Sequence, residues 1–324
     1  MRHLMRFIVA FGALFIVQSF AGAQDTTSLT GVDWLKSMRS AVNTLNYQGN
    51  VSYIKDQQVD SFRVFHCRID GEEKERLVSM NSPLREVVRT GNNITRYSQD
   101  SQQVLVETRP SEQSLLVALP DDLALLEKIY RINLMGREYV AGLQSQVVAL
   151  EPRDGFRYSR ILWIDVATKL PLKLDVLNEE GQSVEQMIFT SINTRDQIPA
   201  RELEPALKSQ KSITQISHRE SLPLRDLRWT LGNVPEGFQI VSYSVLRNPP
   251  SKTPVEQILL SDGFSAVSIY VEEKGERQPS GPRRMGAVNV EVIGLKNQLV
   301  TVMGEVPLRT VESIAKGLAE KPAQ

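Results

Sequence analysis

The sequence predicts an α+β protein, in which a large antiparallel sheet is followed by a smaller α+β domain. Three observations support this fold class. Apolar residues alternate with a period of two through most of residues 47–195, which is the pattern of half-buried strands. Helical spacing is confined to a few short segments. A polar stretch with two prolines at 196–222 divides the 324 residues into two blocks, and this length suits two domains.

The N-terminus has the features of a secretory signal peptide. Arg2 and Arg6 precede an apolar run at residues 7–17, and Ala21 and Ala23 form an A-x-A cleavage motif. The alternative is a membrane anchor, but the run is shorter than the roughly 20 apolar residues that span a bilayer. We expect cleavage after Ala23, and the residue directly after that site, Gln24, is not the cysteine that would accept a lipid.

Charge and cysteine content limit the possible functions. The chain has 38 basic and 38 acidic residues, and removing the signal peptide leaves 36 and 38, a net charge of −2. We therefore do not expect nucleic acid as a partner. The single cysteine, Cys67, cannot form an internal disulfide, so the fold must depend on its core. Cys67 shares a strand face with Phe65 and Ile69, which predicts a buried apolar role.

No catalytic or metal-binding constellation is visible in the sequence. After the signal peptide, His66 and His218 stand without a second histidine or cysteine at ligand spacing. His66 and Cys67 are adjacent on a strand and therefore point to opposite faces. There is no nucleotide-binding or nucleophile motif, although a carboxylate pair stays open. We predict a protein that is not an enzyme and that has no cofactor and no metal.

Two helical segments interrupt the strands of the first block. Residues 31–46 form an amphipathic helix, with Thr30 as N-cap and Asp33 three residues later. Residues 122–132 form a Leu-rich helix inside an insert at 111–136. This second helix has two interpretations: it packs on the sheet as part of the core, or it is a lid over an apolar concavity.

The second block contains a hairpin and a final helix. Asp262 and Gly263 are a preferred type I′ turn pair, so Asp262 is explained by turn chemistry rather than catalysis. Phe264 lies near the hairpin tip, and Tyr270 lies on the face opposite the apolar side chains of its strand. Pro307 suits the first position of the C-terminal helix.

Five stretches of the chain, in order, resemble the RseB/MucB family of periplasmic regulators of envelope-stress sigma factors. They are WLKSMRSAVNTLNYQGNVSYI, GEEKERLVSMNSPLREVVRTGN, RYSRILWIDVATKLPLKLDVLNEEGQSVEQMIF, LGNVPEGFQIV and ILLSDGFSAVSIYVE. Each motif alone is modest, but five in register are specific. The resemblance covers nearly the whole chain after the signal peptide.

The resemblance implies a fold and a function. The N-terminal domain, 24–195, is expected to be LolA/LolB-like: a curved, half-open antiparallel sheet with helices on its concave side. A linker at 196–222 leads to a C-terminal partner-binding domain at 223–324. Family members bind the periplasmic part of a membrane-spanning anti-sigma factor, shield it from regulated proteolysis, and are released by lipid-like signals such as lipopolysaccharide. The implied location is the periplasm.

Site residues follow as hypotheses. For partner binding we expect Phe264, Tyr270, Arg283 and Arg284, since aromatic and arginine side chains are the common interface anchors. For an acyl chain we expect a set of large side chains on the two helices, namely Trp34, Met38, Leu123, Leu126 and Tyr130. The alternatives are internal packing for Phe264 and Tyr270, a solvated loop for Arg283 and Arg284, and a filled core around the helix residues. The rival function is a periplasmic lipid or lipoprotein carrier, and association with a second copy of the chain stays open.

Overall fold

The computed structural model describes residues 29–322, except for residues 56–57, 70, 92, 100–102, 109–116, 118, 120–122, 207–212, 215–218, 248–252 and 276–279. The predicted signal peptide therefore lies outside the described residues, as does the first part of the predicted insert at 111–136.

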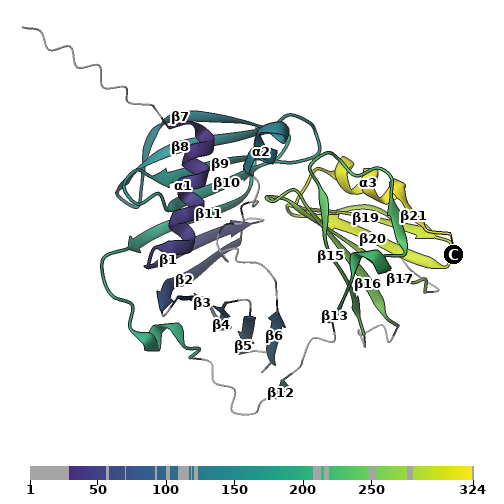
Figure 1. The fold of residues 1–324 in the computed structure, drawn as a ribbon, viewed down its shortest axis with the longest axis horizontal. Coiled ribbons are helices and arrows are strands. Elements are labelled where there is room, and N and C mark those ends of the chain that lie inside the picture. Colours follow the sequence, from purple (N-terminus) through teal and green to yellow (C-terminus); the bar gives the residue numbers. More distant parts are fainter. Residues whose placement is uncertain are drawn as a thin grey trace, which may run out of the picture.

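The first domain is built on a 12-stranded sheet with the order β12-β6-β5-β4-β3-β2-β1-β11-β10-β9-β8-β7. Its elements are α1 (Gly31–Thr44), β1 (Tyr47–Lys55), β2 (Gln58–Ile69), β3 (Glu72–Ser79), β4 (Arg85–Thr90), β5 (Asn93–Ser98), β6 (Gln103–Thr108), α2 (Leu123–Ile129), β7 (Tyr130–Val140), β8 (Leu143–Pro152), β9 (Ser159–Asp165), β10 (Pro171–Leu177), β11 (Ser183–Asn193), η1 (Ala200–Leu203) and β12 (Ile213–Thr214). The pairs are antiparallel except β12–β6. The sheet keeps two edges, at β7 and β12, so the predicted half-open sheet is confirmed (Figure 1).

Helix α1 lies across one face of this sheet (Figure 1). The predicted capping box is present, because the Thr30 side chain accepts from the Asp33 backbone N–H and the Asp33 carboxylate accepts from the Thr30 N–H. The helix buries Trp34, Leu35 and Met38 in the largest core cluster of the molecule's described residues. The predicted helix at 31–46 is therefore confirmed, although it ends at Thr44.

Helix α2 is shorter than the predicted helix at 122–132. It ends at Ile129, and Tyr130 already belongs to β7, where it pairs with Pro152 of β8. The sequence from Tyr130 to Leu134 carries the alternation of a strand, and pairing with β8 satisfies its backbone groups. The expectation of helix at 130–132 was wrong for this reason.

Buried charges cross β2, β3 and β4 on one face of the sheet. The Glu75 carboxylate accepts from the Arg89 guanidinium, and Glu73 accepts from both Arg89 and His66. The other His66 ring nitrogen lies 2.7 Å from the Leu45 carbonyl oxygen at the end of α1. Burial opposes ionisation of Glu73, but the hydrogen bonds from His66 and Arg89 lower its pKa. His66 therefore bridges Glu73 of β3 and the Leu45 carbonyl group, and it anchors the end of α1 to the sheet.

The other face of the same strands holds the start of the predicted linker. The Arg76 guanidinium donates to the Glu202 carbonyl oxygen at 2.8 Å, and the Ala206 N–H donates to the Glu86 carboxylate at 2.9 Å. Arg76 and Glu86 are themselves a buried ion pair. Leu203 of η1 is buried between these contacts. Residues 200–206 are thus fixed to the first domain.

Cys67 is buried with Phe65 and Leu203 in a small apolar cluster. Burial raises the pKa of its thiol, so the thiolate is disfavoured. The predicted apolar role of Cys67 is confirmed.

The second domain is a seven-stranded antiparallel sheet with α3 on one face (Figure 1). Its elements are β13 (Arg219–Leu222), η2 (Leu224–Asp226), β14 (Trp229–Leu231), β15 (Gln239–Leu246), β16 (Val255–Ser261), β17 (Ala266–Glu273), β18 (Gly281–Met285), β19 (Val288–Leu295), β20 (Gln298–Gly304), α3 (Leu308–Gly317) and β21 (Leu318–Glu320). Pro307 is the N-cap of α3 rather than its first residue. The end of the predicted linker, 219–222, pairs with β15 as an edge strand.

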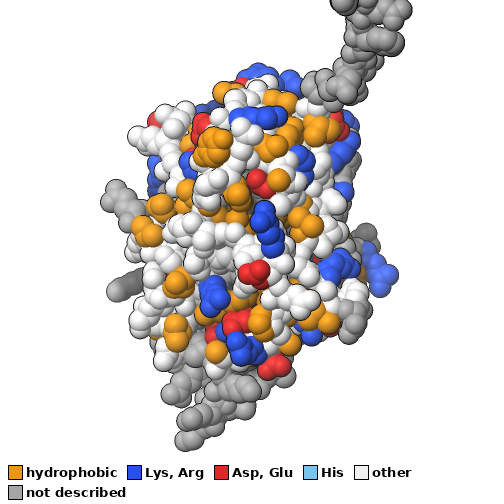
Figure 2. All heavy atoms as spheres, turned by 90° about the vertical axis from the view of Figure 1, so that its left-hand side faces the viewer, with side chains coloured by type: hydrophobic (Ala, Val, Ile, Leu, Met, Phe, Trp, Pro, Cys, Tyr) orange, Lys and Arg blue, Asp and Glu red, His pale blue; other side chains and the backbone are white. Residues whose placement is uncertain are grey.

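The visible face of the first domain carries apolar side chains scattered among charges of both signs (Figure 2). Large exposed apolar residues of the described chain include Leu134, Met135 and Tyr139 on the edge strand β7. The mixed surface agrees with the balanced composition.

Candidate functional site at the domain junction

A buried ion pair fixes the two domains to each other. Arg157 lies just before β9, and its Nε donates to the Asp262 carboxylate at 2.8 Å, with both side chains fully buried. The same guanidinium donates to the Asp154 carboxylate and to the Glu236 carbonyl oxygen. A buried charge is tolerated only when it is paired and hydrogen-bonded, and Arg157 meets both conditions.

Asp262 also organises the hairpin turn from within. One of its carboxylate oxygens accepts from the backbone N–H groups of Phe264 and Ser265, and Gly263 has a φ of 98°. The predicted hairpin is confirmed. The predicted two-residue type I′ turn is wrong, because β16 ends at Ser261 and β17 begins at Ala266, which leaves a longer loop. The side-chain bonds of Asp262 stabilise this longer loop in place of the tight turn.

The turn places Phe264 against the first domain. Its ring meets the Tyr130 ring edge-on, with centroids 6.1 Å apart, and the Arg160 guanidinium lies 5.4 Å above it. Arg160 also donates to the Phe264 carbonyl oxygen at 3.0 Å. Phe264 therefore packs on the core of the N-terminal domain. Phe264, which is expected to bind the partner, and Tyr130, which is expected to bind lipid, are therefore in direct contact.

Two cavities open along the junction, and each contains predicted partner residues. A cavity of about 310 Å³ is lined by Phe264, Tyr270, Arg160 and Glu305. The Tyr270 hydroxyl accepts a hydrogen bond from the Gln257 side chain at 3.0 Å.

The second cavity, of about 330 Å³, is lined by Arg283 and Arg284 together with Tyr158 and Glu179. The structure thus places all four predicted residues at the junction, in two separate groups. Their role in partner binding stays a prediction.

The residues expected to hold an acyl chain lie in one packed cluster. Trp34, Met38, Leu123, Leu126 and Tyr130 are all buried between the helices and the sheet. An acyl chain could reach them only if the helices moved away from the sheet. Their role in lipid binding also stays a prediction.

Two carboxyl groups face each other across the junction. Glu185 of β11 is hydrogen-bonded to Glu305, which follows β20, and Glu305 also pairs with Lys55. Burial, together with the Glu305 carboxyl, raises the pKa of Glu185 to about 7, while Arg160 and Lys55 act in the opposite direction. Burial would raise the pKa of Glu305 too, but the hydrogen bonds from Glu185 and Lys55 lower it. The pair therefore shares one proton near neutral pH.

Sequence reasoning did not single out the arginines of the junction. Arg157 and Arg160 lie in the stretch RDGFRYSR before and within β9, and three arginines in eight residues are the visible signal. A pattern of this kind is also typical of a solvated turn. Only the packing of the second domain shows that these side chains are buried.

Within the described residues, no group of three or more His, Cys, Asp or Glu side chains is arranged to hold a metal ion. No helix in the described part of the chain is long and apolar enough to cross a membrane.

The two domains match two family descriptions in order. Residues 30–207 match the MucB/RseB N-terminal domain, and residues 223–319 match the MucB/RseB C-terminal domain. The chain belongs to the MucB/RseB family. These matches cover both predicted blocks of the sequence, so the resemblance drawn from the five motifs is confirmed.

Curated relatives and solved structures agree with this assignment. The chain is 29% identical to the sigma-E factor regulatory protein RseB of Escherichia coli (strain K12) over 291 residues, which is 90% of this chain and 91% of the relative. It is 28% identical over 316 residues to the sigma factor AlgU regulatory protein MucB of Pseudomonas aeruginosa, covering 96% and 97% of the two chains. Among solved structures, a complex of P. aeruginosa MucA and MucB matches with a TM-score of 0.74 at 26% identity, over 90% of this chain and 99% of that one.

Proposed function

We propose that this MucB/RseB-family protein is a periplasmic negative regulator of an envelope-stress sigma factor. It binds the periplasmic part of a membrane-spanning anti-sigma factor and shields it from regulated proteolysis. The observation that carries the proposal is the match of both domains, in order, to a family whose curated members are named as sigma-factor regulators. A MucB structure in complex with MucA(peri) supports the class of partner, with a TM-score of 0.72 over 90% of this chain.

The proposed route to the periplasm is cleavage of the N-terminal signal peptide after Ala23. The basic residues, the short apolar run and the A-x-A motif support it. Mass spectrometry of the protein purified from the periplasmic fraction should find a chain that begins at Gln24. Full-length chain retained in the membrane fraction would contradict the proposal.

The partner segment is proposed to bind along the junction, where both cavities contain predicted anchors. Tyr270→Ala and Arg284→Ala should each weaken binding of the anti-sigma segment about thirtyfold, which corresponds to roughly 2 kcal/mol for a buried anchor. Thr301→Ala is a matched control, because Thr301 pairs with Tyr270 on the same sheet but lines neither cavity. Isothermal titration with the purified segment measures the three affinities. Unchanged affinity in both variants would place the interface elsewhere.

Shielding is a separate property and needs a separate assay. Limited proteolysis of the anti-sigma segment should slow when this chain is added in excess, and the Tyr270→Ala chain should protect less. If the chain binds the segment tightly yet leaves its cleavage rate unchanged, the regulatory role fails although the partner is correct.

Release by a lipid-like signal is proposed to pass through the contact between Tyr130 and Phe264. Tyr130 belongs to the cluster expected to admit an acyl chain, and Phe264 lies in the cavity expected to hold the partner. An acyl chain that displaced α2 from the sheet would move Tyr130 and remove the edge-on support of the Phe264 ring. By thermodynamic reciprocity, a lipid that weakens partner binding must itself bind less well to the partner-bound protein, by the same factor.

The release proposal has a direct competition test. Lysolipid below its micelle concentration is added to protein saturated with the segment, and partner release is followed by fluorescence anisotropy. Tyr130→Leu should bind lipid but lose coupling, because it keeps an apolar side chain and removes the aromatic contact. Lipid affinity that is identical with and without the segment would refute the switch and leave the N-terminal domain a scaffold.

The same assays address the carrier and enzyme alternatives. A plain lipid or lipoprotein carrier would bind lipid and show no affinity for the anti-sigma segment. We propose no enzymatic activity, and reproducible esterase or protease turnover abolished by one point substitution would contradict this.

A further inference from the structure

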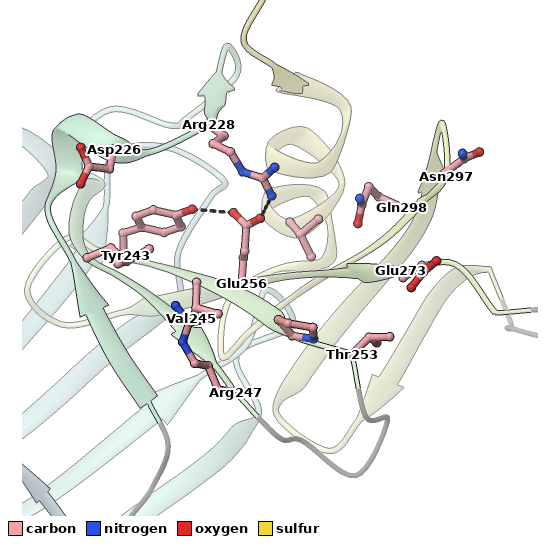
Figure 3. Close-up of a pocket in the computed structure, with 13 residues that line it drawn as sticks. Asp226, Arg228, Tyr243, Val245, Arg247, Thr253, Glu256, Glu273, Asn297 and Gln298 are labelled. Atoms are coloured by element: carbon pink, nitrogen blue, oxygen red, sulfur yellow. Dashed lines mark hydrogen bonds and ion pairs between the residues drawn. The ribbon is translucent and has the colours of Figure 1, made fainter. Parts of the chain in front are cut away.

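A third cavity lies in the C-terminal domain alone, away from the junction. Its volume is about 510 Å³, within the range of roughly 300–1,000 Å³ that ligand pockets occupy. It is bounded by β15, β16 and β17 and by the turn between β19 and β20, and none of its lining residues lines either junction cavity (Figure 3).

The side chain of Glu256 forms the floor of this cavity and is 10% exposed. One carboxylate oxygen accepts from the Tyr243 hydroxyl at 2.6 Å and from the Trp229 indole N–H at 2.9 Å. The other oxygen pairs with the guanidinium of Arg228, which reaches down from the rim (Figure 3). Two buried donors therefore hold the carboxylate in place. Its third partner is the Arg228 guanidinium, whose side chain is 58% exposed.

The charge balance around the cavity favours a cationic ligand. Its lining includes three carboxylates, Asp226, Glu256 and Glu273, and two guanidinium groups, Arg228 and Arg247. Both arginines are already engaged, because Arg228 pairs with Glu256 and Arg247 pairs with Glu220 at 2.6 Å.

Carboxylates outnumber guanidinium groups in the cavity lining. Glu273 has no ion-pair partner among the described residues, and the side-chain amides of Asn297 and Gln298, which offer both acceptors and donors, also line the cavity. An anion entering here would meet this surplus of carboxylates, whereas a donor group would find several acceptors.

We propose that this cavity is a receptor for a lysine or arginine side chain of an extended polypeptide, and that Arg228 occupies the site when the polypeptide is absent. The arriving cation replaces the Arg228 guanidinium on Glu256. Arg228 then returns to solvent, where most of its side chain already lies.

The walls suit the stem of such a side chain. Leu222, Val245, Pro254 and Val271 contribute apolar side chains to the cavity lining. Lysine and arginine bury their methylene stems along apolar surface while the charged head finds its partner. Arginine is the better match, since its planar group donates two parallel bonds to a carboxylate.

The test of this site needs only a short peptide, so its outcome does not depend on the sigma-factor assignment. The probe is acetyl-Gly-Arg-Gly-amide, and the matched control peptide carries citrulline, which keeps the shape and removes the charge. Binding is followed by NMR on the Trp229 indole N–H, which is bonded to Glu256 and will shift when a second cation reaches that carboxylate. The Trp229→Phe chain identifies this signal among the three indoles of the protein.

Three substitutions separate the proposal from a general charge effect. Glu256→Gln keeps the acceptor for Trp229 and Tyr243 and should weaken arginine-peptide binding about tenfold, the effect of roughly one charge-assisted hydrogen bond. Arg228→Gln should tighten binding about threefold or more, because it removes the internal competitor. Arg247→Gln changes the net charge by the same amount but leaves the pair between Arg228 and Glu256 intact. It should alter affinity by less than about twofold.

The proposal is supported if the arginine peptide shifts the Trp229 signal, the citrulline peptide does not, and the two arginine variants differ as stated. It is overturned if both peptides shift the signal alike, or if Arg228→Gln binds no more tightly than Arg247→Gln. Glu273→Gln, a rim substitution at an exposed position, provides a variant that leaves the fold intact if Glu256→Gln does not fold. Loss of affinity in Glu273→Gln supports the cationic site, and unchanged affinity there counts against it.

Discussion

The carboxyl pair at the junction predicts that the protein is less stable above neutral pH. Glu185 has a folded-state pKa of about 7, compared with 4.5 for an ordinary glutamate. The folded protein therefore binds this proton more tightly than the unfolded chain does. By linkage, its contribution to stability is fully present below pH 4.5 and is lost as the pH rises from 4.5 to about 7.

The size of the effect has an upper bound. At about 1.4 kcal/mol per pKa unit, the rise from 4.5 to about 7 corresponds to at most roughly 3.5 kcal/mol. Glu305 is 35% exposed, and Lys55 and Arg160 offset part of the repulsion when both carboxyls are ionised. We therefore expect a loss on the order of 1–2 kcal/mol between pH 5 and pH 8.

The perturbation is Glu185→Gln, which cannot ionise and still offers a hydrogen bond to Glu305. Free energies of unfolding come from urea titrations of the mature chain at pH 5, 6, 7 and 8. The variant should match the wild type at pH 5 and exceed it by about 1–2 kcal/mol at pH 8, because it never develops the second negative charge.

The control is Glu179→Gln, which removes an equal charge from an exposed pair with Arg309 across the same junction. It should change stability by less than about 1 kcal/mol and equally at every pH. If the stability difference between Glu185→Gln and the wild type is the same at pH 5 and pH 8, the shared proton does not exist and the reasoning is refuted.

Three further substitutions test other parts of the fold. Arg157→Ala should lower the free energy of unfolding by about 3–5 kcal/mol, because it leaves the buried Asp262 carboxylate without its ion-pair partner. Calorimetry should then resolve two transitions where the wild type has one, and a single unshifted transition would contradict this. His66→Ala should lower the urea midpoint by the equivalent of about 2–4 kcal/mol, since it removes a donor from Glu73 and the anchor of α1, whereas His66→Gln should recover part of the loss. Gly304→Ala should destabilise by more than about 2 kcal/mol, because its Cβ would lie 2.5 Å from a backbone oxygen of β17, and wild-type stability would show that the strands can separate there.

Local signals in the sequence predicted the elements whose stability is local. Thr30 and Asp33 identify the start of α1 because a capping box is closed within four residues. The hairpin around Gly263 is recognisable because its turn signal is also local, although the loop is longer than the two-residue turn that was predicted. The end of α2 was misplaced because the strand pairing that begins at Tyr130 depends on β8, which lies further along the chain.

The buried charges of β3 and the candidate site at the junction both depend on contacts between residues that are distant in the sequence. The acidic and basic residues of β3 predict a solvent-exposed strand face, because charged residues in an alternating pattern usually point to solvent. They are buried because Glu75 is opposite His66 on β2 and opposite Arg89 on β4, a matter of register across three strands. Phe264 was recognised as a candidate anchor, but its partner Tyr130 could not be inferred from spacing. Only the docking of the second domain brings these two rings together.

The pairing of β12 with β6 sets the length of the tether between the domains. Thr214 is paired in the first sheet and Arg219 is paired in the second, so five residue steps separate the two attachment points. At about 3.3–3.6 Å per residue, the tether reaches at most roughly 18 Å. A C-terminal domain that left the junction would stay within that radius, and redocking would compete with partner binding at an effective concentration on the order of millimolar or above. Loss of the β12–β6 pairing would lengthen the tether back to Ala206, where Glu86 holds the chain, and would lower that concentration without altering any residue of the junction.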